Sequence, residues 1–461
     1  MNEILALSGT QQAQLIRNGV ISSTELVEAH IARIEEINPE LNAVVEVLRA
    51  PALHAAKVVD RRKAAGEALK HFEGVPFSIK DSIEVEGTVC SAGTLGFRNR
   101  ERSTEDATLV ARLRAAGAIP LARTNLPDLL FAFESDNLIF GRTNNPFDVT
   151  RSSGGSSGGE AALIAACGSP FGLGSDAAGS VRLPAHYCGI ASLKPTSGRL
   201  SRAGHVPGPG GWIEMLWQIG PMARHVEDLI AMMQVLLGAD ARDRTVVPMP
   251  WVSHHREPET DCELRVAFFT DNGCAIPDAA TQEAVRAAAA TLGAGVCIEE
   301  ARPPSIECSY ELEMKILGAD GGDGVREYLK DIGSDRTHPL LDGWLAKLER
   351  HRTDVKGFAK YWTELDEFRD EMAGFLTKYD AILSPVASQP AVPHGTSIND
   401  EVFAGFSYTM THNLTGWPAA VVRAGTSPEG LPIGVQIAAA PWREDLVLRL
   451  AHSVEKGFTQ K

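Results

Sequence analysis

Two glycine-rich clusters hold the serines whose surroundings favour nucleophilic chemistry. The first cluster, residues 154–159, reads GGSSGG and places Ser156 and Ser157 between paired glycines at an expected helix N-terminus. Glycine permits positive φ and close backbone approach, and a helix start offers N–H groups to a nearby negative charge. The same letters also describe an ordinary flexible turn, so the cluster alone does not define a site.

The second cluster spans 172–184 and contains another serine after a run of small residues. Ser180 follows Ala177, Ala178 and Gly179, whose backbone N–H groups can converge on one oxygen with little side-chain obstruction. An oxyanion hole requires that arrangement, because its donors must reach the charge that develops on a carbonyl oxygen. A purely structural bend would use the same small residues.

Lys80 is the residue that could activate these serines. It follows residues 76–79, an apolar run typical of a buried strand, so its side chain is expected at a strand end inside the protein. Burial disfavours the ammonium ion and lowers the pKa of lysine, which leaves an amine able to accept a proton. Most lysines instead lie in solvent and do no chemistry.

A competing pattern would make Ser156 the nucleophile. Ser156 and Ser157 each satisfy G-x-S-x-G, the nucleophile elbow of α/β-hydrolases, which needs a preceding strand and a later acid and histidine. Residues 150–153 are not expected to form a strand, and the histidines show no evident partner pattern. The elbow therefore remains an alternative with weak sequence context.

Neither a nucleotide nor a metal cofactor is expected. Residues 172–177 match G-x-G-x-x-A, but no acidic residue lies near position 192, where a ribose-binding acid would be needed. The chain also lacks a His-Glu-x-x-His motif and a Cys/His cluster.

The elements that must position these groups alternate between strands and helices. Short apolar runs predict strands at 74–79, 118–122, 264–269, 381–385, 419–422 and 434–437. Amphipathic or small-residue stretches predict helices before Pro39, at 108–116, 160–166, 279–292 and 305–375, and from Glu444 onward. This alternation predicts an α/β fold.

Composition and charge exclude several classes of protein. With 461 residues, of which 44% are hydrophobic, the chain can bury a large core. A formal charge of −15 argues against a nucleic-acid partner, which needs clustered lysine and arginine to bind phosphates. No apolar run approaches the roughly 20 residues that cross a bilayer, so no membrane span is expected.

The cysteines and the N-terminus predict a cytoplasmic location. The seven cysteines are odd in number, scattered, and form no C-x-x-C pair, which is typical of reduced thiols. Residues 1–20 contain Glu3, no uninterrupted apolar core and no small-residue cleavage pattern, so they are not expected to be a signal peptide.

Read together and in order, these segments resemble the amidase signature family. The likeness is carried by 74–80, 154–160, 172–184, 188–190, 193–196 and 220–224, and it extends to 26–38, 140–146, 413–418 and 430–436. It implies one α/β domain over residues 1–461, with a mixed central β-sheet covered on both faces by helices. The region 240–375 lies outside the likeness and is expected to shape the substrate entrance.

The resemblance also assigns roles to the candidate residues. It implies that Ser180 is the nucleophile, that Ser156 is a middle serine preceded by a cis peptide bond, and that Lys80 is the terminal base. Lys80 would take the proton of Ser156 as Ser156 takes that of Ser180, and the reverse path would protonate the departing nitrogen. Ser157 is expected as a further hydroxyl beside Lys80, and residues 177–179 as the oxyanion hole.

Within the family, the sequence of these motifs is more similar to the fatty acid amide hydrolase branch than to amidotransferase subunits. Leu183 stands where those subunits usually carry a polar residue, and Ala178 replaces the first of the commoner paired glycines. In that branch the stretch that includes Leu130 and Phe131 borders the acyl-binding channel.

We therefore expect a hydrolase for hydrophobic or aromatic amides, and for carbamates (urethanes) and esters, that acts on a small-molecule substrate as a monomer or homodimer. Two alternatives stay open. One is an amidotransferase A-type subunit that releases ammonia from glutamine for a partner enzyme, and the other is an α/β-hydrolase with Ser156 as nucleophile.

Overall fold

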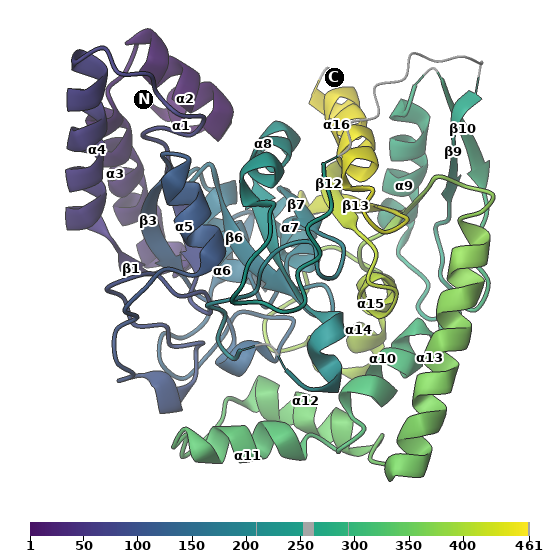
Figure 1. Cartoon of the computed structure of the whole chain (residues 1–461). Coiled ribbons are helices and arrows are strands. Elements are labelled where there is room, and N and C mark those ends of the chain that lie inside the picture. The colour runs from purple at the N-terminus through teal and green to yellow at the C-terminus, as the bar shows by residue number, and fades with distance from the viewer. Residues whose placement is uncertain (209, 252–261, 294, 460–461) are drawn as a thin grey trace.

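A mixed β-sheet passes through the centre of the computed structural model, which describes residues 1–208, 210–251, 262–293 and 295–459 (Figure 1). The strands are β1 (Val44–Val47), β2 (Pro76–Lys80), β3 (Ile119–Thr124), β4 (Asn144–Asn145), β5 (Asp148–Ser152), β6 (Phe171–Asp176), β7 (Ala191–Lys194), β8 (Gln218–Ala223), β9 (Cys262–Phe268), β10 (Gly295–Glu300), β11 (Ala381–Pro385), β12 (Ala419–Thr426) and β13 (Pro432–Ala439). Within the described residues, eleven of them form one sheet in the order β1-β3-β2-β6-β8-β7-β12-β13-β11-β9-β10.

Parallel and antiparallel pairs both occur in this sheet, as predicted. β2 runs parallel to β3 and to β6, and β9 runs parallel to β10 and to β11. The pairs around β8, β12 and β13 are antiparallel. β4 and β5 pair with each other outside this sheet.

Helices connect and cover the strands. Their bounds are α1 (Asn2–Leu5), α2 (Gly9–Asn18), α3 (Ser23–Leu41), α4 (Arg49–Ala64), α5 (Thr108–Ala115), α6 (Gly158–Ala165), α7 (Arg182–Cys188), α8 (Val226–Leu236), α9 (Ala279–Thr291), α10 (Ser309–Leu317), α11 (Asp323–Asp331), α12 (Pro339–Glu349), α13 (Val355–Phe375), α14 (Asp400–Ala404), α15 (Ser407–Leu414) and α16 (Glu444–Thr459). Short 3-10 helices are η1 (Leu95–Phe97), η2 (Asp128–Leu130), η3 (Trp212–Leu216) and η4 (Ile306–Cys308).

Side chains on the central strands alternate between two apolar cores. Ala420 and Val422 of β12 pack in one core with residues of α5, α8, α9 and α16, whereas Val421 between them packs in a second core with α3, α6 and α7. Successive side chains of a strand point to opposite faces, so both faces of the sheet are buried. The prediction of helices on both faces is confirmed.

The described part of residues 240–375 contains the strands β9 and β10 and the helices α9 to α13. In Figure 1, α11 and α12 lie below the sheet and the long helix α13 lies to one side. Trp344 of α12 packs on Phe133 and Phe403, with ring centroids 5.4 and 4.9 Å away. This layer therefore rests on the segment after β3, beside the expected site.

Three local expectations are wrong. α3 continues through Pro39 to Leu41, because proline in a last turn removes only one hydrogen bond from the helix. Residues 148–152 do form a strand, β5, but this short and partly exposed hairpin strand needs no apolar alternation. Cys297 is disulfide-bonded, since scatter along the sequence does not tell which cysteines the fold brings together.

Other cysteines fit the expectation of free thiols. Within the described part of the chain, the free cysteines are Cys90, Cys167, Cys188, Cys274 and Cys308. None of the helices among the described residues combines the length and apolar character that a membrane span requires.

Candidate active site

Two parallel strands bring the first groups of the site together. Lys80 is the last residue of β2, and Ser175 lies near the end of the neighbouring strand β6. Ile79 is paired with Leu173 in parallel register, so the carboxyl ends of both strands meet at one edge of the sheet. In open α/β sheets, ligands bind outside this kind of edge.

Ser156 and Ser157 lie in the turn that leads from β5 to α6. The peptide bond between Gly155 and Ser156 is cis, as the resemblance implied. Gly155 lies close to the neighbouring backbone, because a Cβ added there would be 2.5 Å from the carbonyl oxygen of Ala132. α6 then begins at Gly158, with Ser157 at its N-cap, and continues through strong helix formers.

The amine of Lys80 lies within a cluster of hydroxyl groups. Its Nζ atom is 2.6 Å from Ser156 Oγ, 3.0 Å from Ser157 Oγ and 3.1 Å from Ser175 Oγ. Ser157 Oγ donates to the carbonyl oxygen of Ser175 at 3.2 Å, so toward the amine it acts as acceptor. An uncharged amine can donate to Ser157 and Ser175, which leaves its lone pair for the hydroxyl proton of Ser156.

The surroundings of Lys80 favour this uncharged amine. Lys80 is 0% exposed, and burial lowers its pKa well below the usual value, while Asp176 and Glu160 act in the opposite direction. Glu160 is itself buried, which raises its pKa to about 7 against the hydrogen bonds from Ser78 and Thr124. The amine is therefore suited to accept a proton.

Asp176 and Arg182 fix the loop that carries Ser180. Their side chains are fully buried, with 2.8 Å between Arg182 Nη2 and Asp176 Oδ1. Asp176 also accepts from the N–H groups of Gly179, at 2.8 Å, and Val181, at 3.1 Å, on either side of Ser180. Burial alone would raise the pKa of Asp176, but the Arg182 guanidinium holds it below its usual range, so the carboxylate stays charged.

Arg182 also links this loop to the C-terminal part of the chain. Its guanidinium donates to the carbonyl oxygen of Thr409 at 2.7 Å, to Asn413 Oδ1 at 2.6 Å and to Gln436 Oε1 at 3.2 Å. The position of Ser180 thus depends on residues from α15 and β13.

The predicted oxyanion donors divide into two kinds. The N–H group of Gly179 is bound to Asp176, whereas those of Ala177 and Ala178 have no acceptor within the described residues. Gly179 has a φ of +124°, and a Cβ there would lie 2.3 Å from Thr409 Oγ1. Gly179, which was predicted among the oxyanion donors, therefore shapes the turn, and its N–H group is bound to Asp176.

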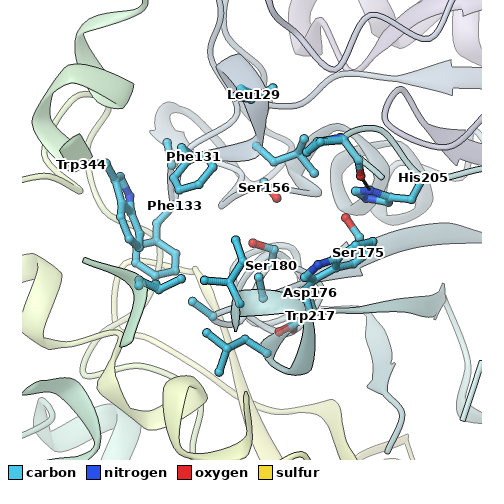
Figure 2. Close-up of a pocket in the computed structure, with 18 of the residues that line it drawn as sticks. Leu129, Phe131, Phe133, Ser156, Ser175, Asp176, Ser180, His205, Trp217 and Trp344 are labelled. Atoms are coloured by element: carbon cyan, nitrogen blue, oxygen red, sulfur yellow. Dashed lines mark hydrogen bonds between the residues drawn. The ribbon is translucent and has the colours of Figure 1, made fainter. Parts of the chain in front are cut away.

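A cavity of about 850 Å³, including the space at its mouth, opens over Ser156 and Ser180. Figure 2 shows both hydroxyl groups at the centre of this cavity. Leu130 and Phe131, the predicted substrate contacts, line it. Leu183 packs in the apolar core and is not among the described residues that line the cavity.

Aromatic side chains stand on both sides of the two serines. Phe131, Phe133 and Trp344 lie on one side in Figure 2, and His205 and Trp217 lie on the other. Sequence reasoning missed His205, Trp217 and Trp344, because they come from separate segments without a motif. Ser175 was also missed, although its place in the second glycine cluster was a usable signal.

His205 lines the cavity, but its ring nitrogens are already bonded. Nδ1 lies 3.0 Å from the carbonyl oxygen of Pro207, and Nε2 lies 3.2 Å from Ser82 Oγ. Burial lowers the pKa of His205 to about 3, so the ring is neutral, donates through Nδ1 and accepts through Nε2. His205 is the only histidine among the described residues that line this cavity, and Ser156 is paired with Lys80, not with a histidine as the nucleophile elbow requires.

The chemistry available to this arrangement is acyl transfer. Within the described residues, no group of three or more His, Cys, Asp or Glu side chains is placed to hold a metal ion. A neutral amine, two serine hydroxyls and two free N–H donors instead meet at one cavity. Together they supply a base, a nucleophile and an oxyanion site.

This fold and this site are those of an amidase. The chain belongs to the amidase family, whose sequence pattern matches residues 25–448. The pattern therefore spans residues 240–375, although this region was predicted to lie outside the likeness. The predicted family, fold and enzyme class are thereby confirmed: the protein is a hydrolase of carbon–nitrogen bonds.

Relatives of the chain include different kinds of amidase. It is 31% identical to fatty-acid amide hydrolase 2 of Homo sapiens over 490 residues, which cover 99% of this chain and 90% of that one. It is 32% identical to the A-type subunit of glutamyl-tRNA(Gln) amidotransferase from Carboxydothermus hydrogenoformans over 485 residues, 98% of each chain. The solved structure of 6-aminohexanoate cyclic dimer hydrolase complexed with substrate matches with a TM-score of 0.84 and 30% identity, over 98% of this chain and 97% of that one.

Proposed function

We propose that this amidase hydrolyses hydrophobic or aromatic amides through an acyl-enzyme on Ser180, and that it also accepts aryl carbamates (urethanes) and esters. The observation that carries this proposal is the apolar and aromatic lining of the cavity over Ser180. Small-molecule sites of this kind bind mainly by apolar burial, with a few polar groups that orient the reacting bond.

In the proposed reaction, Ser180 Oγ attacks the carbonyl carbon while its proton passes to Ser156 and the proton of Ser156 passes to Lys80. The N–H groups of Ala177 and Ala178 stabilise the oxygen as it gains charge. The proton then returns through Ser156 to the nitrogen, the carbon–nitrogen bond breaks and the amine leaves. Water repeats the sequence on the acyl-enzyme and frees Ser180.

The charges around the cavity argue against glutamine as substrate. Asp176 is the only carboxylate among the described lining residues, and Arg182 neutralises it; no lysine or arginine is among them. The α-ammonium and α-carboxylate of glutamine would be buried without partners of opposite charge, which is costly. A neutral aromatic acyl group meets no such penalty.

Substrate comparison with the purified chain tests the proposal. We expect kcat/KM to fall in the order 4-nitroanilide of an aromatic acid, aryl carbamate, then glutamine, and each added ring or methylene in the acyl group to change it about tenfold or more. Glutamine as the best of the three substrates would overturn the proposal.

That outcome would instead support an amidotransferase A-type subunit. This second candidate is favoured by the 32% identity to such a subunit, which is close to the identity with fatty-acid amide hydrolase 2. A subunit of this kind needs glutamine and its partner proteins, whereas the proposed hydrolase acts alone on anilides.

Covalent labelling tests the role of Ser180. A fluorophosphonate is expected to modify Ser180, because its phosphorus takes the place of the carbonyl carbon under attack. Peptide mass mapping that finds the adduct on Ser156 would instead support the nucleophile elbow.

We further propose that residues 1–461 form one domain in which 240–375 shapes the substrate entrance. Leu317 and Trp344 from this region line the cavity, which supports the assignment. A cytoplasmic location and a monomeric or homodimeric state stay predictions from the sequence.

A further inference from the structure

The second aromatic wall of the cavity is built from two rings that pack against each other at an angle. Trp217 lies between η3 and β8, and its indole packs on the imidazole of His205 with 4.5 Å between ring centroids and 42° between their planes. The guanidinium carbon of Arg202 lies 4.9 Å from the centre of the same indole. Both rings line the cavity that contains Ser180.

This wall is held rigidly by its neighbours. Arg202 is almost fully buried and forms ion pairs with Glu214, at 2.8 Å, and Asp243, at 3.5 Å. Pro207 and Ser82 hold the two nitrogens of the His205 ring. A planar group that enters beside Trp217 would therefore meet a preformed surface and would not have to order flexible side chains.

The wall lies on the side of the two serines where Ser175 contacts Lys80 (Figure 2). His205 is bound to Ser82, which lies two residues after Lys80 in the chain. Figure 2 shows Ser175, whose hydroxyl contacts Lys80, beside His205 and Trp217. The wall of His205 and Trp217 therefore lies beside the proposed proton relay, whereas Phe131, Phe133 and Trp344 lie on the other side of Ser180 in Figure 2.

We propose that Trp217 and His205 form a separate subsite for the leaving group, and that it favours arylamines, so that the substrate class is N-aryl amides and N-aryl carbamates with an apolar or aromatic acyl part. This inference rests on the proposed function. The relay protonates the nitrogen, so the amine must lie on the Lys80 side, and the acyl part must then lie toward Phe131 and Trp344.

The electrical neutrality of the wall agrees with an arylamine. The ring of His205 is uncharged, and Asp176, the carboxylate in this part of the cavity, is bound by Arg182. An arylamine leaves as a neutral planar molecule at neutral pH and can stack on an indole. An alkylamine becomes a cation after it leaves and would find no free carboxylate among the described residues that line the cavity.

A leaving-group subsite has a distinct kinetic signature. The amine departs when the acyl-enzyme forms, so a residue that contacts the amine affects acylation and has no further role in deacylation. A residue that contacts the acyl part affects both steps. Trp217 and Trp344 should therefore give opposite patterns.

The experiment uses the full chain and three amides of one aromatic acid: the anilide, the cyclohexylamide of similar size but without a planar ring, and the primary amide. For Trp217→Ala we expect the ratio of kcat/KM between anilide and cyclohexylamide to fall about tenfold or more. The deacylation rate, measured from the 4-nitrophenyl ester of the same acid after its burst, should stay within about twofold.

Trp344→Ala is the matched control on the opposite wall. It should leave the ratio between anilide and cyclohexylamide within about twofold and should change the deacylation rate instead. If Trp217→Ala shows no cooperative thermal transition, Trp217→Leu takes its place. Leucine keeps apolar volume but removes the aromatic plane, so this variant is expected to lower the same ratio.

Several outcomes would overturn the inference. An unchanged anilide ratio in the Trp217 variants, or a slower deacylation in place of a changed ratio, would place Trp217 outside a leaving-group subsite. Failure of the wild-type chain to hydrolyse any of the three amides would reject the proposed function itself, whereas activity with an unaltered ratio would reject the subsite alone.

Discussion

The proposed chemistry depends on Lys80, because burial lowers the pKa of its amine and favours the uncharged form. Lys80 is surrounded by hydroxyl groups and hydrogen-bonds no carboxylate among the described residues, and the effect of burial on its pKa outweighs the opposing effect of Asp176 and Glu160. A lysine in solvent would be protonated at neutral pH and could not take the proton of Ser156.

Substitution of this lysine tests its role. Lys80→Ala removes base, relay and leaving-group protonation together, so amide hydrolysis should fall by roughly 10²–10⁴-fold or more, and esters should suffer less because their leaving group needs no proton. Steady-state kcat on both substrate types measures this.

Lys194 provides a control, because it is also fully buried with a pKa lowered to about 7 but, among the described residues, hydrogen-bonds only the carbonyl oxygen of Pro195. Lys194→Met should lower stability and leave the folded protein active on amides. Near-normal amide turnover in Lys80→Ala would make Lys80 a structural residue.

The pH dependence of activity follows from the same pKa. Because the amine acts only after losing its proton, kcat/KM should rise with pH and reach a plateau. The midpoint of this rise should lie below the pKa of free lysine, about 10.4. An ionised Glu160 favours the ammonium form, so Glu160→Gln should move this midpoint to lower pH. A midpoint that moves upward or not at all would contradict this coupling.

Sequence reasoning located this chemistry because the residues that carry it lie in glycine clusters and at a strand end. Lys80, Ser156 and Ser157 meet as expected. The role of Gly179 could not be foreseen, because whether a backbone N–H is free depends on where the Asp176 side chain turns. The wall of His205 and Trp217 could not be found either, since packing between rings of loop residues leaves no periodic pattern.

At the level of elements, the loop between β6 and α7 is held by a buried ion pair. Asp176 receives two N–H groups of this loop, and Arg182 at the start of α7 carries the compensating charge. Removal of either partner would leave a buried charge without compensation.

Arg182→Met should therefore destabilise the fold by about 3–5 kcal/mol. Arg49→Met, which breaks an exposed ion pair with Glu35, should cost no more than about 1 kcal/mol. Urea unfolding of both variants measures the difference. Equal stabilities would mean that Asp176 is satisfied by the N–H groups alone.

Strand and helix positions were predictable to different degrees. β11 was placed at its observed bounds, and β2, β12, β13 and α16 were placed close to theirs, because each is a buried run or an amphipathic helix. β5 was missed because a hairpin outside the sheet lacks that pattern.

At the level of the whole molecule, the order of the sheet joins distant parts of the sequence. Among the described residues, the sheet strands before residue 224 lie side by side, those after residue 261 do so too, and the pair of β7 with β12 joins the two groups. Single-sequence patterns predict which segments are strands, but the order of the strands depends on tertiary packing that local patterns do not contain.

Contact of Arg182 with Asn413 and Gln436 bears on how the protein is made. Synthesis proceeds from the N-terminus, so the ribosome completes Lys80, Ser156 and Ser180 long before it adds the residues that hold the loop of Ser180. On ribosomes stalled at increasing lengths, fluorophosphonate labelling of Ser180 should begin only once Gln436 has left the exit tunnel. Labelling of much shorter nascent chains would show that the loop forms without Asn413 and Gln436.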